Sequence, residues 1–267
     1  MKSYPGRNAG RHQDRQVSTL AAVTRVLLLA GTTEATRLAE VLVGEGVDVL
    51  SSLAGVTAVP ALRAGEVRRG GFGGIEGLVR HLREHPVDAV IDATHPFAAV
   101  MPWHVAAACS ATGTPSCRVL RPAWTAGPGD RWVGVPDLPA AAEALGTLGA
   151  RRVLLTVGRQ STWAFAGLDG WFLIRAIEAP DVAPVDHQLL LDRGPFDLDS
   201  ELALLREHRI DAVVTKNAGG EATAAKLVAA RELGVTVVMV ARPPQPDVTV
   251  VAGVDQAVDW LGEATGR

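Results

Sequence analysis

Short apolar runs alternate along this chain with Ala- and Leu-rich segments whose apolar residues recur at helical spacing. In the first half, these runs predict strands at 26–30, 47–50, 66–68 and 87–91. A helix is predicted after the first strand, and another at 78–84, where Pro86 ends it. Strands that alternate with helices are typical of a mostly parallel sheet covered on both faces, so we predict an α/β fold.

The second half of the chain repeats the first. Two sequence words recur in the same order: Arg25-Val26-Leu27-Leu28 as Arg152-Val153-Leu154-Leu155, and Arg83-Glu84-His85 as Arg206-Glu207-His208. Arg121-Pro122 is matched in the same way by Arg242-Pro243. Strands are predicted in this half at 153–157, 172–176, 212–215 and 235–240. Such repetition indicates two copies of one α/β unit, with a ligand cleft between the carboxyl ends of their strands.

The boundary between the two units is predicted where turn-forming residues crowd together: Pro122, Gly127, Pro128 and Gly129. We therefore predict a first domain at 23–130 and a second at 131–267. A strand is predicted at 132–135, and it fits the sheet of either domain. Residues 1–22 are polar and have no sustained apolar region of the kind a secretory signal needs, so we expect a disordered extension.

Composition narrows the class of protein. The 267 residues are 48% hydrophobic and 21% charged, which suffices for the cores of two domains. The net charge of −3 argues against nucleic-acid and membrane-surface partners, and no apolar run approaches the roughly 18 residues that span a bilayer. Cys109 and Cys117 give neither a metal-ligand spacing nor a disulfide framework. We expect a cytoplasmic protein that acts on a small molecule.

The turn after the first strand is the first candidate ligand site. Gly31-Thr32-Thr33-Glu34 precedes a helix, where free backbone N–H groups attract phosphate. The usual three-glycine fingerprint is absent, and one glycine also serves turn geometry alone. Ser51 and Ser52 stand where an NAD-binding protein presents an acid to the ribose. Because hydroxyls can bind a 2′-phosphate, this pair favours NADPH over NADH; the alternative is two hydroxyls that end a strand.

Two further loops are expected to face the same ligand. Gly70-Gly71-Phe72-Gly73-Gly74 leaves its backbone uncovered, which favours a close approach by a cofactor to Gly71, Phe72 and Gly73, the alternative being a flexible loop. The segment from Asp92 to Phe97 ends a buried strand at the edge where the first turn emerges. We therefore predict that Thr94 and His95 point toward the ligand.

One motif resembles a zinc site. His81-Leu82-Arg83-Glu84-His85 fits the H-x-x-E-H pattern of some metalloproteases. The repeat of this segment, Leu204-Leu205-Arg206-Glu207-His208, keeps the Glu-His pair and lacks the first histidine. We therefore interpret the pair as the architecture of a helix end, and we expect no metal.

Taken in order along the chain, the turn at Gly31-Thr32-Thr33-Glu34, the Ser51-Ser52 pair, the loop from Gly70 to Gly74 and the segment from Asp92 to Phe97 resemble the precorrin-6A reductase family of cobalamin biosynthesis. The resemblance covers about residues 25–244 and continues in the second half through Gly158-Arg159-Gln160, Trp171 to Arg175, Arg193-Gly194-Pro195-Phe196 and Thr215 to Gly220. It implies two Rossmann-like domains, NADPH bound mainly on the first, and reduction of one double bond of precorrin-6A to give precorrin-6B. A branch of the family acts on a cobalt-bearing substrate, and these residues do not separate the two branches.

A tetrapyrrole with many carboxylates calls for cations at the strand ends that face the cofactor. The expected substrate contacts are Arg159, Gln160, Arg175, Arg193 and Asn217. Reduction of a carbon–carbon double bond also needs a proton. His95 and Lys216 are the candidate donors, and solvent is the alternative.

A second function class stays open from the residues alone. Two α/β lobes around a cleft also describe a sugar-nucleotide transferase, or a protein that binds a phosphorylated ligand without redox chemistry. For the reductase, handover of the macrocycle to neighbouring enzymes of the pathway is a further expectation.

Overall fold

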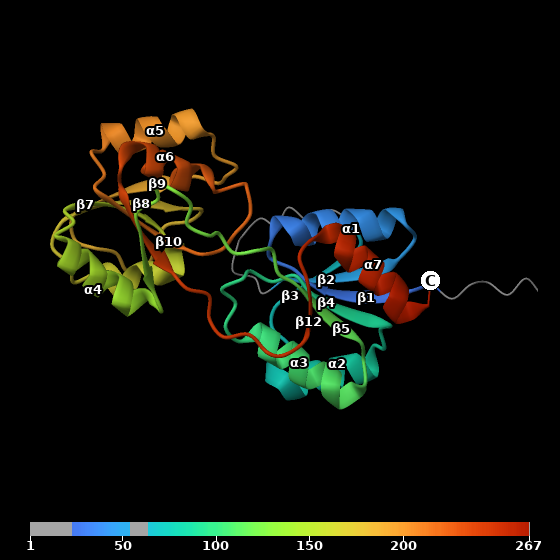
Figure 1. Cartoon of the computed structure of the whole chain (residues 1–267). Helices are drawn as coiled ribbons and strands as arrows, with labels where there is room; N and C mark the ends of the chain where they lie inside the picture. Colours follow the sequence, from blue (N-terminus) through green and yellow to red (C-terminus); the bar gives the residue numbers. More distant parts are fainter. Residues whose placement is uncertain (1–22, 54–63, 267) are drawn as a thin grey trace, which may run out of the picture.

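The computed structural model describes residues 23–53 and 64–266, and the extension predicted at 1–22 lies outside this range. Within the described residues the chain forms two six-stranded sheets whose strands are all parallel. Figure 1 shows that each sheet, with its helices, makes a separate lobe. The predicted α/β fold with parallel sheets is confirmed.

The first lobe has the strand order β12-β5-β4-β1-β2-β3. Its strands are β1 (Arg25–Leu29), β2 (Asp48–Leu53), β3 (Glu66–Arg69), β4 (Ala89–Asp92), β5 (Ser116–Val119) and β12 (Thr249–Val251). Its helices are α1 (Thr33–Gly44), α2 (Gly74–Glu84), α3 (Met101–Thr112) and α7 (Val254–Thr265). Successive residues of β1 point to opposite faces, so Leu28 packs under α1 and α7 while Leu27 packs under α2 and α3.

The second lobe has the strand order β6-β11-β10-β7-β8-β9. Its strands are β6 (Trp132–Val135), β7 (Arg152–Thr156), β8 (Trp171–Ala176), β9 (His187–Leu191), β10 (Ala212–Lys216) and β11 (Thr236–Val240). Its helices are α4 (Leu138–Leu148), the 3₁₀ helix η1 (Arg159–Phe165), α5 (Leu198–Glu207) and α6 (Ala225–Leu233). Leu155 of β7 packs under α4 and η1, and Leu154 packs under α5 and α6.

The chain passes between the lobes twice. After β5 it crosses to β6, which pairs with β11, so the strand at 132–135 belongs to the second sheet. After β11 it returns, and β12 pairs with β5 of the first sheet. Figure 1 shows α7, in red, beside α1, in blue.

The predicted second domain, 131–267, is therefore wrong at its C-terminal end, because β12 and α7 complete the first lobe. Apolar patterning indicates that a strand exists and which face is buried. It does not indicate which of two similar sheet edges the strand joins.

Candidate active site

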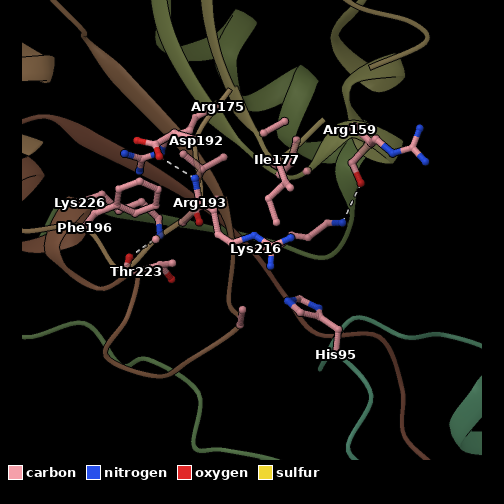
Figure 2. Close-up of a pocket in the computed structure, with 18 of the residues that line it drawn as sticks. His95, Arg159, Arg175, Ile177, Asp192, Arg193, Phe196, Lys216, Thr223 and Lys226 are labelled. Carbon is pink, nitrogen blue, oxygen red and sulfur yellow. Dashed lines mark hydrogen bonds between the residues drawn. The ribbon is translucent and has the colours of Figure 1, made fainter. Parts of the chain in front are cut away.

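The carboxyl ends of strands from both sheets meet at one cavity of about 450 Å³. The second lobe lines it with residues that follow β7, β8, β9 and β10, and the first lobe contributes His95 and Arg121. Figure 2 shows His95 on one side of this space and Arg159, Arg175, Arg193, Lys216 and Lys226 on the other. The predicted cavity between two strand-end faces is present.

The turn that follows β1 is built around Thr32. Its hydroxyl caps α1 by accepting a hydrogen bond from the Ala35 N–H at 3.1 Å, and it donates to the Ala93 carbonyl at 2.9 Å. This ties the start of α1 to the end of β4. Gly31 has φ +155°, and Thr33 is exposed beside it. The Thr32 hydroxyl therefore holds this turn in place, and both its donor and one of its acceptor positions are occupied by the protein.

Glu34, the fourth residue of that turn, makes an ion pair that links the lobes. Arg121 Nη1 donates to both of its carboxylate oxygens at 2.8 Å, and Arg121 Nε donates to the Ala218 carbonyl at 2.8 Å. Partial burial is the largest single influence and would by itself raise the pKa of Glu34. The hydrogen bonds and positive charge of Arg121, together with the Glu34 N–H and the Thr32 hydroxyl, outweigh it and lower the pKa. Glu34 therefore serves the lobe junction, whereas the sequence predicted a cofactor contact.

Ser51 and Ser52, at the end of β2, are both buried, and the neighbouring strand adds an arginine that the sequence analysis missed. Arg68 of β3 donates to the Ser52 hydroxyl at 2.9 Å. The Ser51 hydroxyl has no hydrogen-bond partner among the described residues. The signal that could have found Arg68 is its position on the strand paired with β2, two residues before the loop from Gly70 to Gly74, which we call the glycine loop.

The glycine loop owes its composition to backbone conformation and to packing. Gly73 and Gly74 have φ values of +83° and +82°, which favour glycine. Arg68 holds the loop by donating to the Gly71 carbonyl at 3.3 Å and by lying 3.9 Å from the centroid of the Phe72 ring. A Cβ atom on Gly77 would come 1.7 Å from the Phe72 carbonyl oxygen. These contacts join the loop to β3 and to α2.

A buried ion pair fixes the segment after β4. Arg118 of β5 donates to Asp92 at 2.5 Å, and the other oxygen of Asp92 accepts from the Thr94 hydroxyl at 2.6 Å and the Thr94 N–H at 3.0 Å. Arg118 also donates to the His95 carbonyl at 3.4 Å. Thr94 is therefore engaged within its own loop, and Asp92 and Arg118 are positioning residues that the sequence analysis did not single out.

His95 lines the cavity. Its Nδ1 accepts a hydrogen bond from the Phe97 N–H at 3.2 Å, which leaves the proton of a neutral ring on Nε2. Removal from bulk water, followed by the positive charges of Arg121 and Lys216, lowers the pKa of His95 to about 4, although part of the ring is open to the cavity. His95 is therefore neutral at pH 7.

Lys216 ends β10 and points into the same cavity. Its ammonium donates to the buried Ser161 hydroxyl at 2.7 Å and lies 5.4 Å from the centroid of the Phe97 ring. The Phe97 and His95 ring centroids are 6.0 Å apart. The two predicted proton donors therefore come from different lobes and meet around one phenylalanine. Burial lowers the pKa of Lys216.

Four of the five predicted substrate contacts line the cavity: Arg159, Gln160, Arg175 and Arg193. Gln160 and Arg193 are exposed, and Arg159 lies 3.3 Å from Glu178. Arg175 is buried, with its guanidinium paired to Glu201 and 3.9 Å from the Phe196 ring centroid.

Asn217 has a different position. Its amide accepts from the Trp124 N–H at 2.8 Å and donates to the Trp124 carbonyl at 3.0 Å. Asn217 therefore holds the segment that crosses between the lobes. Lys226 of α6 also lines the cavity, and the sequence analysis did not single it out.

The histidines of the H-x-x-E-H segment lie on α2 and at its C-cap. The His81 and His85 ring centroids are 4.9 Å apart, and His81 packs 5.0 Å from the centroid of Phe72. Burial lowers the pKa of His81. Within residues 23–53 and 64–266, no group of three or more His, Cys, Asp or Glu side chains could hold a metal ion. No helix in the same ranges has the length and apolarity to cross a membrane.

Comparison with known proteins gives one consistent family. A family model described as precorrin-6x reductase CbiJ/CobK matches residues 25–262. The precorrin-6A reductase of Rhodococcus erythropolis is 52% identical over 249 residues, covering 92% of this chain and all of that protein. The cobalt-precorrin-6A reductase of Priestia megaterium is 29% identical over 254 residues, covering 90% and 99%.

A solved structure shares the arrangement of both lobes. The precorrin-6A reductase CobK superposes with a TM-score of 0.85 and 42% sequence identity, covering 91% of this chain and 97% of that one. Because the family model spans β1 to α7 and the similarity extends over both lobes, this chain belongs to the precorrin-6x reductase family.

Proposed function

We propose that this protein is an NADPH-dependent precorrin-6A reductase of cobalamin biosynthesis, in which the first lobe holds the cofactor and the second lobe binds the carboxylates of the tetrapyrrole. The observation that supports this most is the cavity at which the two strand-end faces meet, with five arginine and lysine side chains of the second lobe along it: Arg159, Arg175, Arg193, Lys216 and Lys226. Bound NADPH supplies the hydride. The family match decides against the transferase alternative.

The described residues of the first lobe fit a dinucleotide that carries a 2′-phosphate. Ser52 and Arg68 are partners on β2 and β3, and Arg68 donates to the Ser52 hydroxyl at 2.9 Å. Leu53 follows Ser52 and ends β2, so the end of this strand presents no carboxylate that would repel a phosphate. We assign Ser52 and Arg68 to the 2′-phosphate, and the Gly31 turn and the glycine loop to the rest of the dinucleotide. Ser51 points to the opposite face of β2 and is not part of this assignment.

Lys216 is the better candidate for the proton donor. An acid must carry its proton at the working pH, and the imidazole of His95, with a pKa of about 4, is neutral at pH 7. The Lys216 Nζ donates a hydrogen bond to the Ser161 hydroxyl, which holds this hydrogen-bearing group at the cavity. We assign His95 to hydrogen bonding through Nε2–H and Lys216 to protonation of the second carbon of the reduced bond.

The metal-free substrate is favoured over the cobalt-bearing one. Identity is 52% with the precorrin-6A reductase of R. erythropolis and 29% with the cobalt-precorrin-6A reductase of P. megaterium, over similar lengths. Handover of the product to a neighbouring enzyme stays a prediction.

The test is a pair of measurements on the purified full chain. NADPH fluorescence titrated with protein should shift or quench, and NADH should bind more weakly. Addition of precorrin-6A should then consume one NADPH per macrocycle, and the loss of NADPH absorbance measures this consumption. Binding of NADPH without consumption in the presence of precorrin-6A would refute the proposal.

A further inference from the structure

Lys226 lines the cavity although only 3% of its surface is exposed. Its ammonium donates to the Thr223 carbonyl at 2.5 Å and lies 4.9 Å from the centroid of the Trp124 ring. Figure 2 shows it on the same side of the cavity as Arg175, away from His95. An ammonium carries three hydrogens, and within the described residues two of them have no acceptor. Such a group is incomplete without a ligand.

The charges around Lys226 are also unbalanced. The charged groups that act on it are Arg175 of β8 and Glu201 of α5, which form a buried ion pair with each other. One oxygen of Glu201 has no hydrogen-bond partner in the described structure. With Lys226 protonated, the three buried groups carry a net positive charge, which is unfavourable away from water. One anion in the cavity would neutralise it.

We propose that Lys226 binds one carboxylate of the tetrapyrrole at the base of the cavity. This inference rests on the proposed function, since that function supplies the carboxylates. A carboxylate at this position accepts the two unused hydrogens and restores the charge balance with Arg175 and Glu201. Lys226 would then set how deeply the macrocycle enters the second lobe.

Binding of a carboxylate should also add a proton to Lys226, because of the pKa that its amine has in the free protein. Burial, and after it the charge of Arg175, lower the pKa of Lys226 to about 7, while Glu201 acts in the opposite direction. A bound carboxylate favours the ammonium and raises the pKa. Above pH 7 the free amine must therefore take up a proton when substrate binds, so affinity should fall by up to about tenfold per pH unit.

The experiment measures binding of precorrin-6A to the full chain from pH 6 to pH 9. The protein is loaded with NADP⁺, which carries no hydride, so no turnover occurs. The wild type should show a rising Kd above pH 7 and proton uptake in calorimetry with buffers of different ionisation enthalpy. Lys226→Met should raise Kd at pH 6.5 by about tenfold or more and abolish the proton uptake. Lys226→Arg, which stays charged, should bind with a Kd that does not rise above pH 7.

Arg206→Met is the matched control, because Arg206 is an exposed cation of α5 that does not line the cavity. It should bind as the wild type does. NADPH titration and thermal unfolding of each variant verify that both lobes are folded. A Lys226→Met protein that binds within twofold of wild type, or that keeps the proton uptake, would overturn the inference. Absence of wild-type turnover would instead overturn the proposed function, and this inference with it.

Discussion

Arg68 is the residue that connects the separate parts of the predicted cofactor face. Its guanidinium contacts the Ser52 hydroxyl, two carbonyl oxygens of the glycine loop and the ring of Phe72. Neutral partners satisfy its hydrogen bonds, so its positive charge is not cancelled by an ion pair among the described residues. A phosphate beside Ser52 would supply the negative charge that pairs with the Arg68 guanidinium.

Replacement of Arg68 should therefore change the choice of cofactor. We expect Arg68→Gln to raise KM for NADPH by about 10-fold to 100-fold, because a charge-assisted hydrogen bond contributes roughly 1.5–3 kcal/mol, and to leave KM for NADH nearly unchanged. Steady-state kinetics with both cofactors measures this. Arg69→Gln is the control, since neighbouring residues of a strand point to opposite faces and Arg69 is exposed. Equal losses with NADPH and NADH would contradict the assignment.

Lys216 and His95 should differ in their effect on turnover. We expect Lys216→Ala to lower kcat by about 10²-fold, as is usual for a general acid, and His95→Ala to lower it by less than about 10-fold. Because the pKa of His95 is about 4, removal of His95 should not change the kcat profile above pH 6. Rates at saturating substrate are the measurement. If both variants keep near-normal kcat, solvent supplies the proton.

At the scale of elements, the start of α2 depends on a close contact with the loop before it. Gly77, in the first turn of α2, leaves room for the Phe72 carbonyl, and Gly73 and Gly74 give the backbone its left-handed turn. The loop and the helix therefore form one unit, which places Phe72 under Arg68.

An added methyl group at Gly77 should disturb this unit. We expect Gly77→Ala to lower the free energy of unfolding by about 1–3 kcal/mol and to weaken NADPH binding, because the backbone of Phe72 must move. Gly146→Ala in α4 is the control: a Cβ there meets nothing within 4 Å, and stability should rise by up to about 1 kcal/mol. Chemical denaturation and NADPH titration measure the two effects. Unchanged NADPH affinity in a destabilised Gly77→Ala would separate the loop from the cofactor site.

The sequence predicted strands near β1, β2, β3, β4, β6, β7, β8, β10 and β11. All of these except β3, which is Glu-Val-Arg-Arg, contain a short apolar run. The prediction missed three strands for physical reasons. β9 is an edge strand whose side chains are mostly exposed, β5 contains the buried Arg118, and β12 has three residues. Each of these departs from the pattern that burial on both faces produces.

The candidate site was predictable to a similar extent. Strand ends locate His95, Lys216 and the arginines, because the carboxyl ends of parallel strands meet at one edge. The hydrogen-bond and ion-pair partners of the site residues were not predictable from the sequence. Asn217 and Glu34 are used by the segments that cross between lobes, and such contacts join residues far apart in the sequence.

At the scale of the whole molecule, the two crossing segments meet at one carbonyl group. Arg121 and Arg242, which open the two Arg-Pro words, both donate to the Ala218 carbonyl, at 2.8 and 3.1 Å. Arg121 extends this contact to Glu34 of α1. The relative position of the lobes thus depends on a small polar junction beside the cavity.

The ion pair at this junction should give stability that depends on pH. The pKa of Glu34 is below its ordinary value, so the stabilisation is present above about pH 4.5 and is lost as pH falls through the lowered pKa. We expect Glu34→Gln to lose about 1 kcal/mol at pH 7 and to differ less and less from the wild type as the pH falls below about 4.5. Glu40→Gln, on an exposed site of α1, is the control. Thermal unfolding across this pH range checks this, and a deficit that does not shrink with falling pH would contradict it.

The return of β12 to the first sheet determines the order in which the lobes can be completed during synthesis. The strands of the second sheet all lie within residues 132–240, so they leave the ribosome one after another with no strand of the first sheet between them. The first sheet, although its β1 is made early, keeps an unpaired β5 edge and an uncovered α1 face until β12 and α7 emerge. The half of the protein that is translated first is therefore finished last.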